Sequence, residues 1–143
     1  MTTKTLYVMV GLPRSGKSSF AQNNTDTTPI ANPDSIRKAM GHVYYAPIEP
    51  MVWAVTKLMV RSLFLAGHNT VCLDACNVSK ERRDEWINPL EWDTRFVCVH
   101  TEDSLEKQVE ICKARAVATQ QEYLIPVIDS MAKQWDWEGS TKG

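Results

Sequence analysis

The residues with the clearest chemical meaning form one short run that fits the pattern G-x-x-x-x-G-K-[ST]. The glycines of such a loop let consecutive backbone N–H groups turn inward onto phosphate oxygens. Lys17 is expected to reach the β- and γ-phosphates of a nucleoside triphosphate, and the Ser18 hydroxyl to ligate Mg²⁺. The predicted contacts of this loop with the nucleotide are Gly11, Pro13, Arg14, Ser15, Gly16, Lys17, Ser18 and Ser19.

A second pair of chemically active residues is Asp34 and Arg37, which lie three apart at the start of a predicted helix. Residues at this spacing share one helical face. The Asp34 carboxylate can orient an attacking hydroxyl while Arg37 holds an anionic part of the acceptor. A structural alternative stands beside this one, because acids are common in the first helical turn and Arg37 can simply pair with Asp34.

Asp74 is the third candidate, because it follows directly on the apolar run 70–73. An acid delivered by the end of a buried strand is typical of a Mg²⁺-associated carboxylate in phosphoryl-transfer proteins. The alternative is that Asp74 caps the turn that follows the strand. Ser18 and Asp74 are the predicted metal ligands.

Strands alternate with helices along the chain, and this alternation has to position the three groups. Apolar runs predict strands at 6–10, 29–31, 70–74 and 94–100, while helical patterns occupy 18–22, 33–40, 49–66, 79–86, 103–118 and a segment from 126. Asn32 and Ser79 are predicted N-caps, and Gly67 is a predicted C-terminal cap. The long helix 49–66 is expected to bury Val52, Val55, Met59, Leu63 and Ala66.

Such alternation requires crossover connections, so we predict a three-layer α/β fold with a central parallel sheet and helices on both faces. Ligands bind beyond the carboxyl ends of the strands in such sheets. The phosphate loop, the Asp34–Arg37 pair and Asp74 should therefore converge on one crevice.

Composition restricts the class of protein. At 143 residues and 43% hydrophobic content, the chain is expected to form one globular domain over 1–143, with 138–143 as a frayed tail. A net charge of −1 disfavours broad adhesion to a nucleic-acid duplex, although a local basic groove is compatible with it. Without a long apolar stretch or a charged leader, we predict no membrane span, no secretory signal and a cytoplasmic location. The four cysteines match no zinc spacing and are expected to be reduced thiols, as in a cytosolic protein.

Four blocks, in collinear order over nearly the whole chain, resemble the 5′-kinase domain of phage polynucleotide kinase and its relatives among small P-loop kinases. They are Gly11-Leu12-Pro13-Arg14-Ser15-Gly16-Lys17-Ser18, Asn32-Pro33-Asp34-Ser35-Ile36-Arg37, Leu73-Asp74-Ala75-Cys76-Asn77-Val78-Ser79-Lys80-Glu81-Arg82-Arg83 and Ile125-Pro126-Val127-Ile128-Asp129-Ser130-Met131. The resemblance implies that Lys17 and Ser18 hold ATP·Mg²⁺. It also implies that Asp34 activates a 5′-hydroxyl, Arg37 grips the neighbouring phosphate and Asp74 supports the site.

Two features depart from that family. Arg14 occupies a position where glycine is frequent, and the lid is poor in the arginines that clasp nucleotide phosphates in the family. Within the lid stretch Lys113 and Arg115 are the basic residues, and only Arg115 is nominated as a nucleotide contact.

The preferred function is an ATP-dependent kinase for the 5′-hydroxyl of a nucleic-acid end, single-stranded or small, with a role in nucleic-acid repair.

Two other functions stay open at this stage. One is a kinase for a small acceptor such as a nucleotide, a modified base or a sugar acid, and the other is an ATP-binding protein with little catalysis. Tyr44 and Tyr45, in a loop near the crevice, are candidates for stacking on a base. The sequence indicates neither DNA over RNA nor an oligomeric state.

Overall fold

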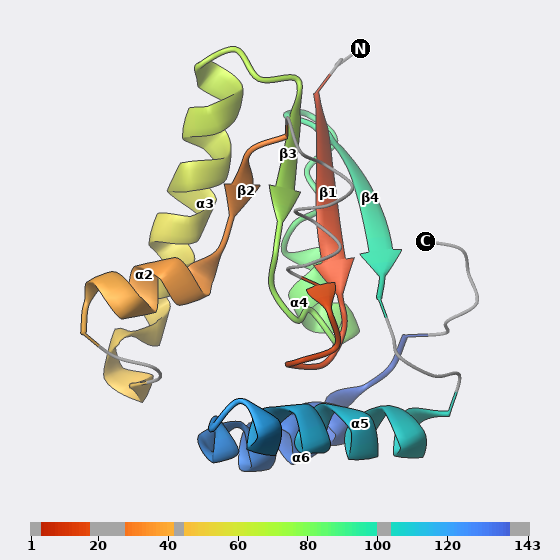
Figure 1. Ribbon diagram of the computed structural model, residues 1–143. Coiled ribbons are helices and arrows are strands. Elements are labelled where there is room, and N and C mark those ends of the chain that lie inside the picture. Colours follow the sequence, from red (N-terminus) through yellow and green to blue (C-terminus); the bar gives the residue numbers. More distant parts are fainter. Residues whose placement is uncertain (1–3, 18–27, 42–44, 100–103, 138–143) are drawn as a thin grey trace.

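The computed structural model describes residues 4–17, 28–41, 45–99 and 104–137. Its sheet has four strands in the order β2-β3-β1-β4, and every neighbouring pair is parallel (Figure 1). The strands are β1 (Thr5–Val10), β2 (Ile30–Ala31), β3 (Thr70–Leu73) and β4 (Asp93–Cys98). The predicted α/β class with a central parallel sheet is therefore confirmed.

The helices follow the predicted order. They are α2 (Pro33–Ala39), α3 (Glu49–Leu65), α4 (Lys80–Asp84), α5 (Leu105–Ala118) and α6 (Ile125–Gln134), with short 3-10 turns at Ala46–Ile48 and Glu122–Leu124. Over the described residues, no helix combines the length and the apolar character needed to cross a membrane. The predicted helix at 18–22 and the predicted tail at 138–143 lie outside the described residues.

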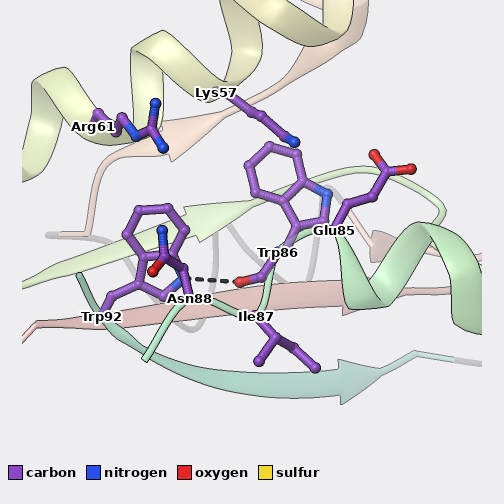
Figure 2. Close-up of a pocket in the computed structure, with 7 residues that line it drawn as sticks. All are labelled: Lys57, Arg61, Glu85, Trp86, Ile87, Asn88 and Trp92. Atoms are coloured by element: carbon purple, nitrogen blue, oxygen red, sulfur yellow. Dashed lines mark hydrogen bonds between the residues drawn. The ribbon is translucent and has the colours of Figure 1, made fainter. Parts of the chain in front are cut away.

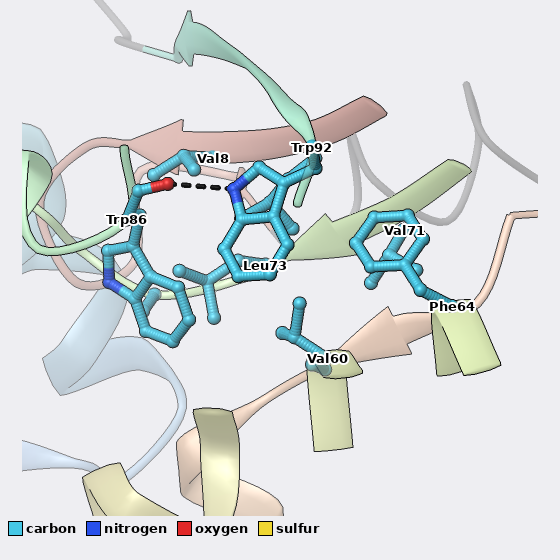
Figure 3. Packing of buried hydrophobic residues seen from close by; sticks show 10 residues of the cluster. Val8, Val60, Phe64, Val71, Leu73, Trp86 and Trp92 are labelled. Carbon is cyan, nitrogen blue, oxygen red and sulfur yellow. Dashed lines mark hydrogen bonds between the residues drawn. The ribbon is translucent and has the colours of Figure 1, made fainter. Parts of the chain in front are cut away.

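Side chains on β1 alternate between two faces of the sheet, as the twofold repeat of a strand requires. Leu6 and Val8 turn toward the main core, whereas Met9 packs with Cys72 in a separate cluster. In the main core, Val60 and Phe64 from α3 pack over Val71 and Leu73, with the rings of Trp86 and Trp92 beside them (Figure 3). This packing fixes α3 against the β3 side of the sheet.

The buried face of α3 differs from the prediction by about one residue. The buried positions are Val52, Thr56, Val60 and Phe64, while Ala66 is exposed and Val55, Met59 and Leu63 are partly buried. A threonine can face the core here because its hydroxyl donates a 2.7 Å hydrogen bond to the carbonyl of Val52 within the helix. The predicted face is confirmed at Val52 and in part at Met59 and Leu63, which pack against the core, whereas the burial of Thr56 was not predicted.

Helices α5 and α6 pack on each other beyond the carboxyl ends of the strands (Figure 1). Their apolar cluster contains Cys112, Ala116 and Ile128, and it reaches the phosphate loop through Leu12. The helical pair therefore lies at the same edge of the sheet as the loop.

The segment after α6 is fastened to the rest of the molecule by Asp136. Its carboxylate accepts a 2.7 Å hydrogen bond from the guanidinium of Arg83 and a 2.8 Å hydrogen bond from the backbone N–H of Lys80. Arg83 is buried and also donates to the carbonyls of Asn77 and Val78. Burial raises the pKa of Asp136, but these hydrogen bonds outweigh it and leave the pKa below its ordinary value.

We expect Asp136→Asn to lower the free energy of unfolding by about 1–2 kcal/mol at pH 7, because a charge-assisted hydrogen bond to Arg83 is lost. A depressed folded-state pKa contributes stability above the unfolded pKa and loses it as the pH falls. The difference between wild type and variant should therefore shrink from about pH 4 downward in urea unfolding. The exposed ion pair of Lys80 with Asp84 offers a control, since Asp84→Asn should change stability by under about 0.5 kcal/mol. A difference for Asp136→Asn that is constant from pH 7 to pH 3 would contradict this account.

Candidate functional site

The loop at 11–17 follows β1 and turns sharply onto the carboxyl edge of the sheet. Gly16 has φ +102°, a left-handed backbone angle that glycine adopts without strain, and Arg14 also has a positive φ of 67°. The position that the family resemblance assigns to glycine is thus one whose backbone favours glycine. Arg14 adopts that conformation at a cost of about 1 kcal/mol.

Gly11 is required by close packing rather than by its backbone angle. A Cβ at this position would lie 2.6 Å from the carbonyl oxygen of Val99 and 2.7 Å from the Ser15 hydroxyl. The Gly11 N–H donates to the carbonyl of Cys76, which ties the loop to the segment after β3. Ser15 is buried, and its hydroxyl has no hydrogen-bond partner among the described residues. A buried hydroxyl without a partner and a tight glycine turn fit a loop built to receive phosphate oxygens.

Lys17 lies at the inner end of the loop with only 8% of the residue exposed. Its ammonium donates a 2.9 Å hydrogen bond to the carbonyl of Leu12, so the charge is held inside the curve of the loop. Burial of the stem beside a backbone carbonyl holds the ammonium close to the phosphate loop. Ser18 and Ser19 lie outside the described residues, so their predicted contacts stay predictions.

Asp74 follows β3 directly, and only 5% of the residue is exposed. Asn32 comes from the end of β2, and its side-chain amide lies 3.5 Å from the Asp74 carboxylate. This contact joins the carboxyl ends of two neighbouring strands. The described residues contain no group of three His, Cys, Asp or Glu side chains placed to hold a metal. One carboxylate still suits Mg²⁺, because this ion takes one or two carboxylates together with substrate phosphates and water.

Cys76 lies within electrostatic range of three of the predicted groups. Burial raises the pKa of its thiol, and the nearby charge of Lys17 opposes that rise. The carboxylates of Asp34 and Asp74 act on the same thiol and raise its pKa further. All three side chains thus lie near enough to Cys76 for their charges to act on it, so the structure brings them to one region.

Arg37 is held by two carboxylates. Its Nη1 donates a 2.5 Å hydrogen bond to Asp34, while Nε and Nη2 donate to the two oxygens of Glu49 at 2.8 and 2.7 Å. The Asp34 side chain is 71% exposed, whereas those of Arg37 and Glu49 are 14% and 16% exposed. The pairing of Arg37 with Asp34 that the sequence left as one alternative is therefore present, together with a second, more buried partner.

Sequence reasoning did not find Glu49. It is the first residue of α3, and it meets α2 only because the two helices pack together. The hydrogen bonds of Glu49 raise the pKa of Arg37, and those of Arg37 lower the pKa of Glu49. Trp53, one turn further along α3, has its ring 5.9 Å from the Arg37 guanidinium. The Arg37 side chain is thus fixed by charge on one side and by an aromatic ring on another.

Arg115 reaches the phosphate loop from α5. Its Nη1 donates a 3.0 Å hydrogen bond to the backbone carbonyl of Arg14, so the Arg115 guanidinium lies beside the backbone of the loop. Tyr45 is 48% exposed in the segment before α3, whereas Tyr44 lies outside the described residues. The four cysteines have free thiols, with Cys72 and Cys112 buried.

Comparison with known families gives one match over most of the chain. A model described as an AAA domain matches residues 6–135. No curated protein matches the sequence.

Solved structures share the fold at low sequence identity. A chain from the Pnkp1/Rnl/Hen1 RNA repair complex is 20% identical with a TM-score of 0.63, covering 99% of this chain and 52% of that one. A gluconokinase from Sinorhizobium meliloti 1021 is 16% identical with a TM-score of 0.58, covering 99% of this chain and 81% of that one. A fungal RNA kinase is 17% identical with a TM-score of 0.54, covering 95% and 67%. The chain therefore spans about half the length of the first of these structures.

Proposed function

The chain belongs to the AAA domain family and is a small P-loop kinase whose phosphate loop implies ATP binding, and from this we propose that it phosphorylates the 5′-hydroxyl of a polynucleotide end. The observation that carries the proposal is the arrangement of Asp34, Arg37 and Glu49. An exposed carboxylate and a positioned guanidinium lie together at the sheet edge that also holds the phosphate loop. A phosphoryl acceptor with a hydroxyl and a nearby anion matches those two groups.

Lys17 and the loop amides would hold the triphosphate, with Arg14 and Arg115 placed to add positive charge beside it. Bound ATP supplies the γ-phosphoryl group, and Mg²⁺, which Ser18 and Asp74 would hold, neutralises charge on the phosphate oxygens. The buried Lys17 ammonium would stabilise charge that develops on those oxygens during transfer.

Asp34 would act on the acceptor side. Its carboxylate is open to solvent and is held through one oxygen by Arg37, so the other oxygen can accept a hydrogen bond from the attacking hydroxyl. Orienting that hydroxyl is the expected contribution, because phosphoryl transfer depends mainly on positioning and charge.

Arg37 would recognise the anion next to the reacting hydroxyl. Glu49 grips its Nε and Nη2 and so directs the Nη1 side of the guanidinium toward Asp34 and the acceptor. In a polynucleotide the reacting hydroxyl and a phosphate belong to the same sugar, which places the anion within reach of that arginine. A planar guanidinium suits a phosphate better than an ammonium does.

A second candidate is a kinase for a small anionic acceptor such as a sugar acid. The similarity in fold to a gluconokinase over nearly the whole chain favours it, and a carboxylate can pair with Arg37 as a phosphate can. A protein that binds ATP with little catalysis is the third possibility, and the lid supports it, because few basic residues occur there.

Asp34→Asn should lower turnover on a 5′-hydroxyl oligonucleotide by about a hundredfold or more, on the scale of a positioned base. ATP affinity should change little, because Asp34 belongs to the acceptor side of the site. Steady-state transfer of labelled phosphate measures the first quantity, and calorimetric titration with a non-hydrolysable ATP analogue measures the second.

Ser35→Ala is a matched control, since Ser35 is an exposed neighbour of Asp34 on α2 and should leave both values near wild type. Loss of ATP affinity in Asp34→Asn, with Ser35→Ala unaffected, would assign Asp34 to the nucleotide or metal side and overturn its proposed role.

A further inference from the structure

A cavity of about 220 Å³ lies between α3 and the segment that joins α4 to β4 (Figure 2). It is lined by Lys57, Arg61, Glu85, Trp86, Ile87, Asn88 and Trp92. None of these residues belongs to the phosphate loop or to the Asp34–Arg37–Glu49 group. Its lining combines the basic side chains of Lys57 and Arg61 and the acidic Glu85 with two tryptophans that are 0% and 4% exposed.

Trp86 supplies a hydrogen-bond donor without a partner. The residue is 0% exposed, and its indole N–H has no hydrogen-bond partner in the described part of the chain. The neighbouring indole of Trp92 differs, because its N–H donates to the carbonyl of Trp86. A buried donor costs free energy when it is unpaired. The unpaired Trp86 N–H therefore indicates that a ligand supplies the missing acceptor atom.

Lys57 supplies the positive charge. Its ammonium lies 5.7 Å from the centre of the Trp86 ring, and no ion pair joins it to any described acid. The other cations beside the cavity are neutralised, Arg61 by Glu91 and Arg82 by Glu85. Because the lysine stem has several rotatable bonds, the ammonium can move from the ring onto an anion in the cavity.

A row of side chains on α3 connects this cavity with the proposed acceptor site. Glu49, Trp53 and Lys57 are four residues apart and so lie on one side of the helix, with about 12 Å of axial rise between the first and the last. Trp53 contacts both ends of this row, because its ring lies 5.9 Å from the Arg37 guanidinium and 6.5 Å from the Trp86 ring. The Arg82 guanidinium stacks over the same Trp53 ring at 4.2 Å.

We propose that this cavity binds a second nucleotide of the acceptor strand, downstream of the nucleotide whose hydroxyl is phosphorylated. A phosphate oxygen accepts from the Lys57 ammonium and the Trp86 N–H, and the base packs against the exposed side chain of Ile87. The inference rests on the proposed function, since it assumes a polynucleotide acceptor at Arg37. It extends that function, because it predicts that a longer acceptor strand binds more tightly through contacts in the cavity beside α3.

Calorimetric titration of the full chain with a 5′-hydroxyl trinucleotide and with a nucleoside 3′-monophosphate tests the proposal. The trinucleotide should bind more tightly than the monophosphate. Lys57→Met, which keeps the stem and removes the charge, should raise the Kd of the trinucleotide about tenfold and leave that of the monophosphate unchanged. Lys133→Met, at an exposed lysine of α6, should change neither value.

Glu85 gives a variant of opposite sign. Its carboxylate faces the same cavity, so Glu85→Gln should lower the Kd of the trinucleotide by removing a repulsive charge and releasing Arg82. Equal affinity for the two ligands, or equal effects of Lys57→Met on both, would overturn the inference. Phosphoryl transfer to the monophosphate is measured separately, and its absence would overturn the proposed function whatever the ratio of the two Kd values.

Discussion

Lys17→Ala is expected to abolish phosphoryl transfer and to leave the fold intact. The expected loss is about a thousandfold or more, because the buried ammonium stabilises charge that develops on the transferring phosphate. The fold should survive because the described hydrogen bonds of this ammonium go to the Leu12 carbonyl and the Cys76 thiol, both beside the phosphate loop. Activity is measured as label transferred from γ-labelled ATP, and folding as the circular dichroism spectrum and the midpoint of thermal unfolding.

Lys17→Met is the control for volume, since it preserves most of the buried stem while removing the charge. It should be as inactive as Lys17→Ala and closer to wild type in stability. Transfer at a wild-type rate in either folded variant would show that the Lys17 ammonium is not needed for phosphoryl transfer, and would contradict the proposed role of the phosphate loop.

The second large effect is expected at Arg37. Arg37→Ala should lower transfer to a nucleoside 3′-monophosphate by about a hundredfold or more, because a charge-assisted contact with the acceptor phosphate is lost. The preference for 3′-phosphorylated over unphosphorylated nucleosides should disappear with it. Arg37→Lys should restore only part of the preference, since a compact ammonium cannot stay paired with Glu49 through two donors and still present a further donor toward the acceptor.

Arg37→Ala also leaves Glu49 half-buried without its main partner, which can destabilise the protein on its own. The double variant Arg37→Met/Glu49→Gln removes both charges and leaves no unpaired carboxylate there. It should fold with near wild-type stability and still lack the preference. A double variant that keeps the preference would show that another group recognises the acceptor phosphate.

Local features of this fold were predictable from the sequence because single residues specify them. Asn32 caps α2 by accepting from the N–H of Asp34, and Ser79 caps α4 by accepting from that of Arg82, as their types and positions indicate. The strand ends that carry the phosphate loop and Asp74 were also correct, since short apolar runs followed by glycine or acid mark them. These features depend on neighbours within four residues.

Features that depend on packing between distant segments were not predictable. Glu49 pairs with Arg37 across a contact between two helices. In the sequence it cannot be told apart from other acids, which are common in the first turn of a helix. Thr56 lies in the core through a hydrogen bond to its own helix, which hydropathy cannot show. The contact of Arg115 with the loop carbonyl spans 101 residues, so the sequence could nominate that arginine but could not place it.

Acceptor choice is the most direct test of the central claim. Wild-type protein is incubated with γ-labelled ATP and, separately, with a 5′-hydroxyl oligonucleotide, a nucleoside 3′-monophosphate, the matching nucleoside and gluconate. The account predicts label on the oligonucleotide and on the 3′-monophosphate, with little on the nucleoside and none on gluconate. Label on gluconate or equally on the unphosphorylated nucleoside would contradict it and identify a kinase for small acceptors.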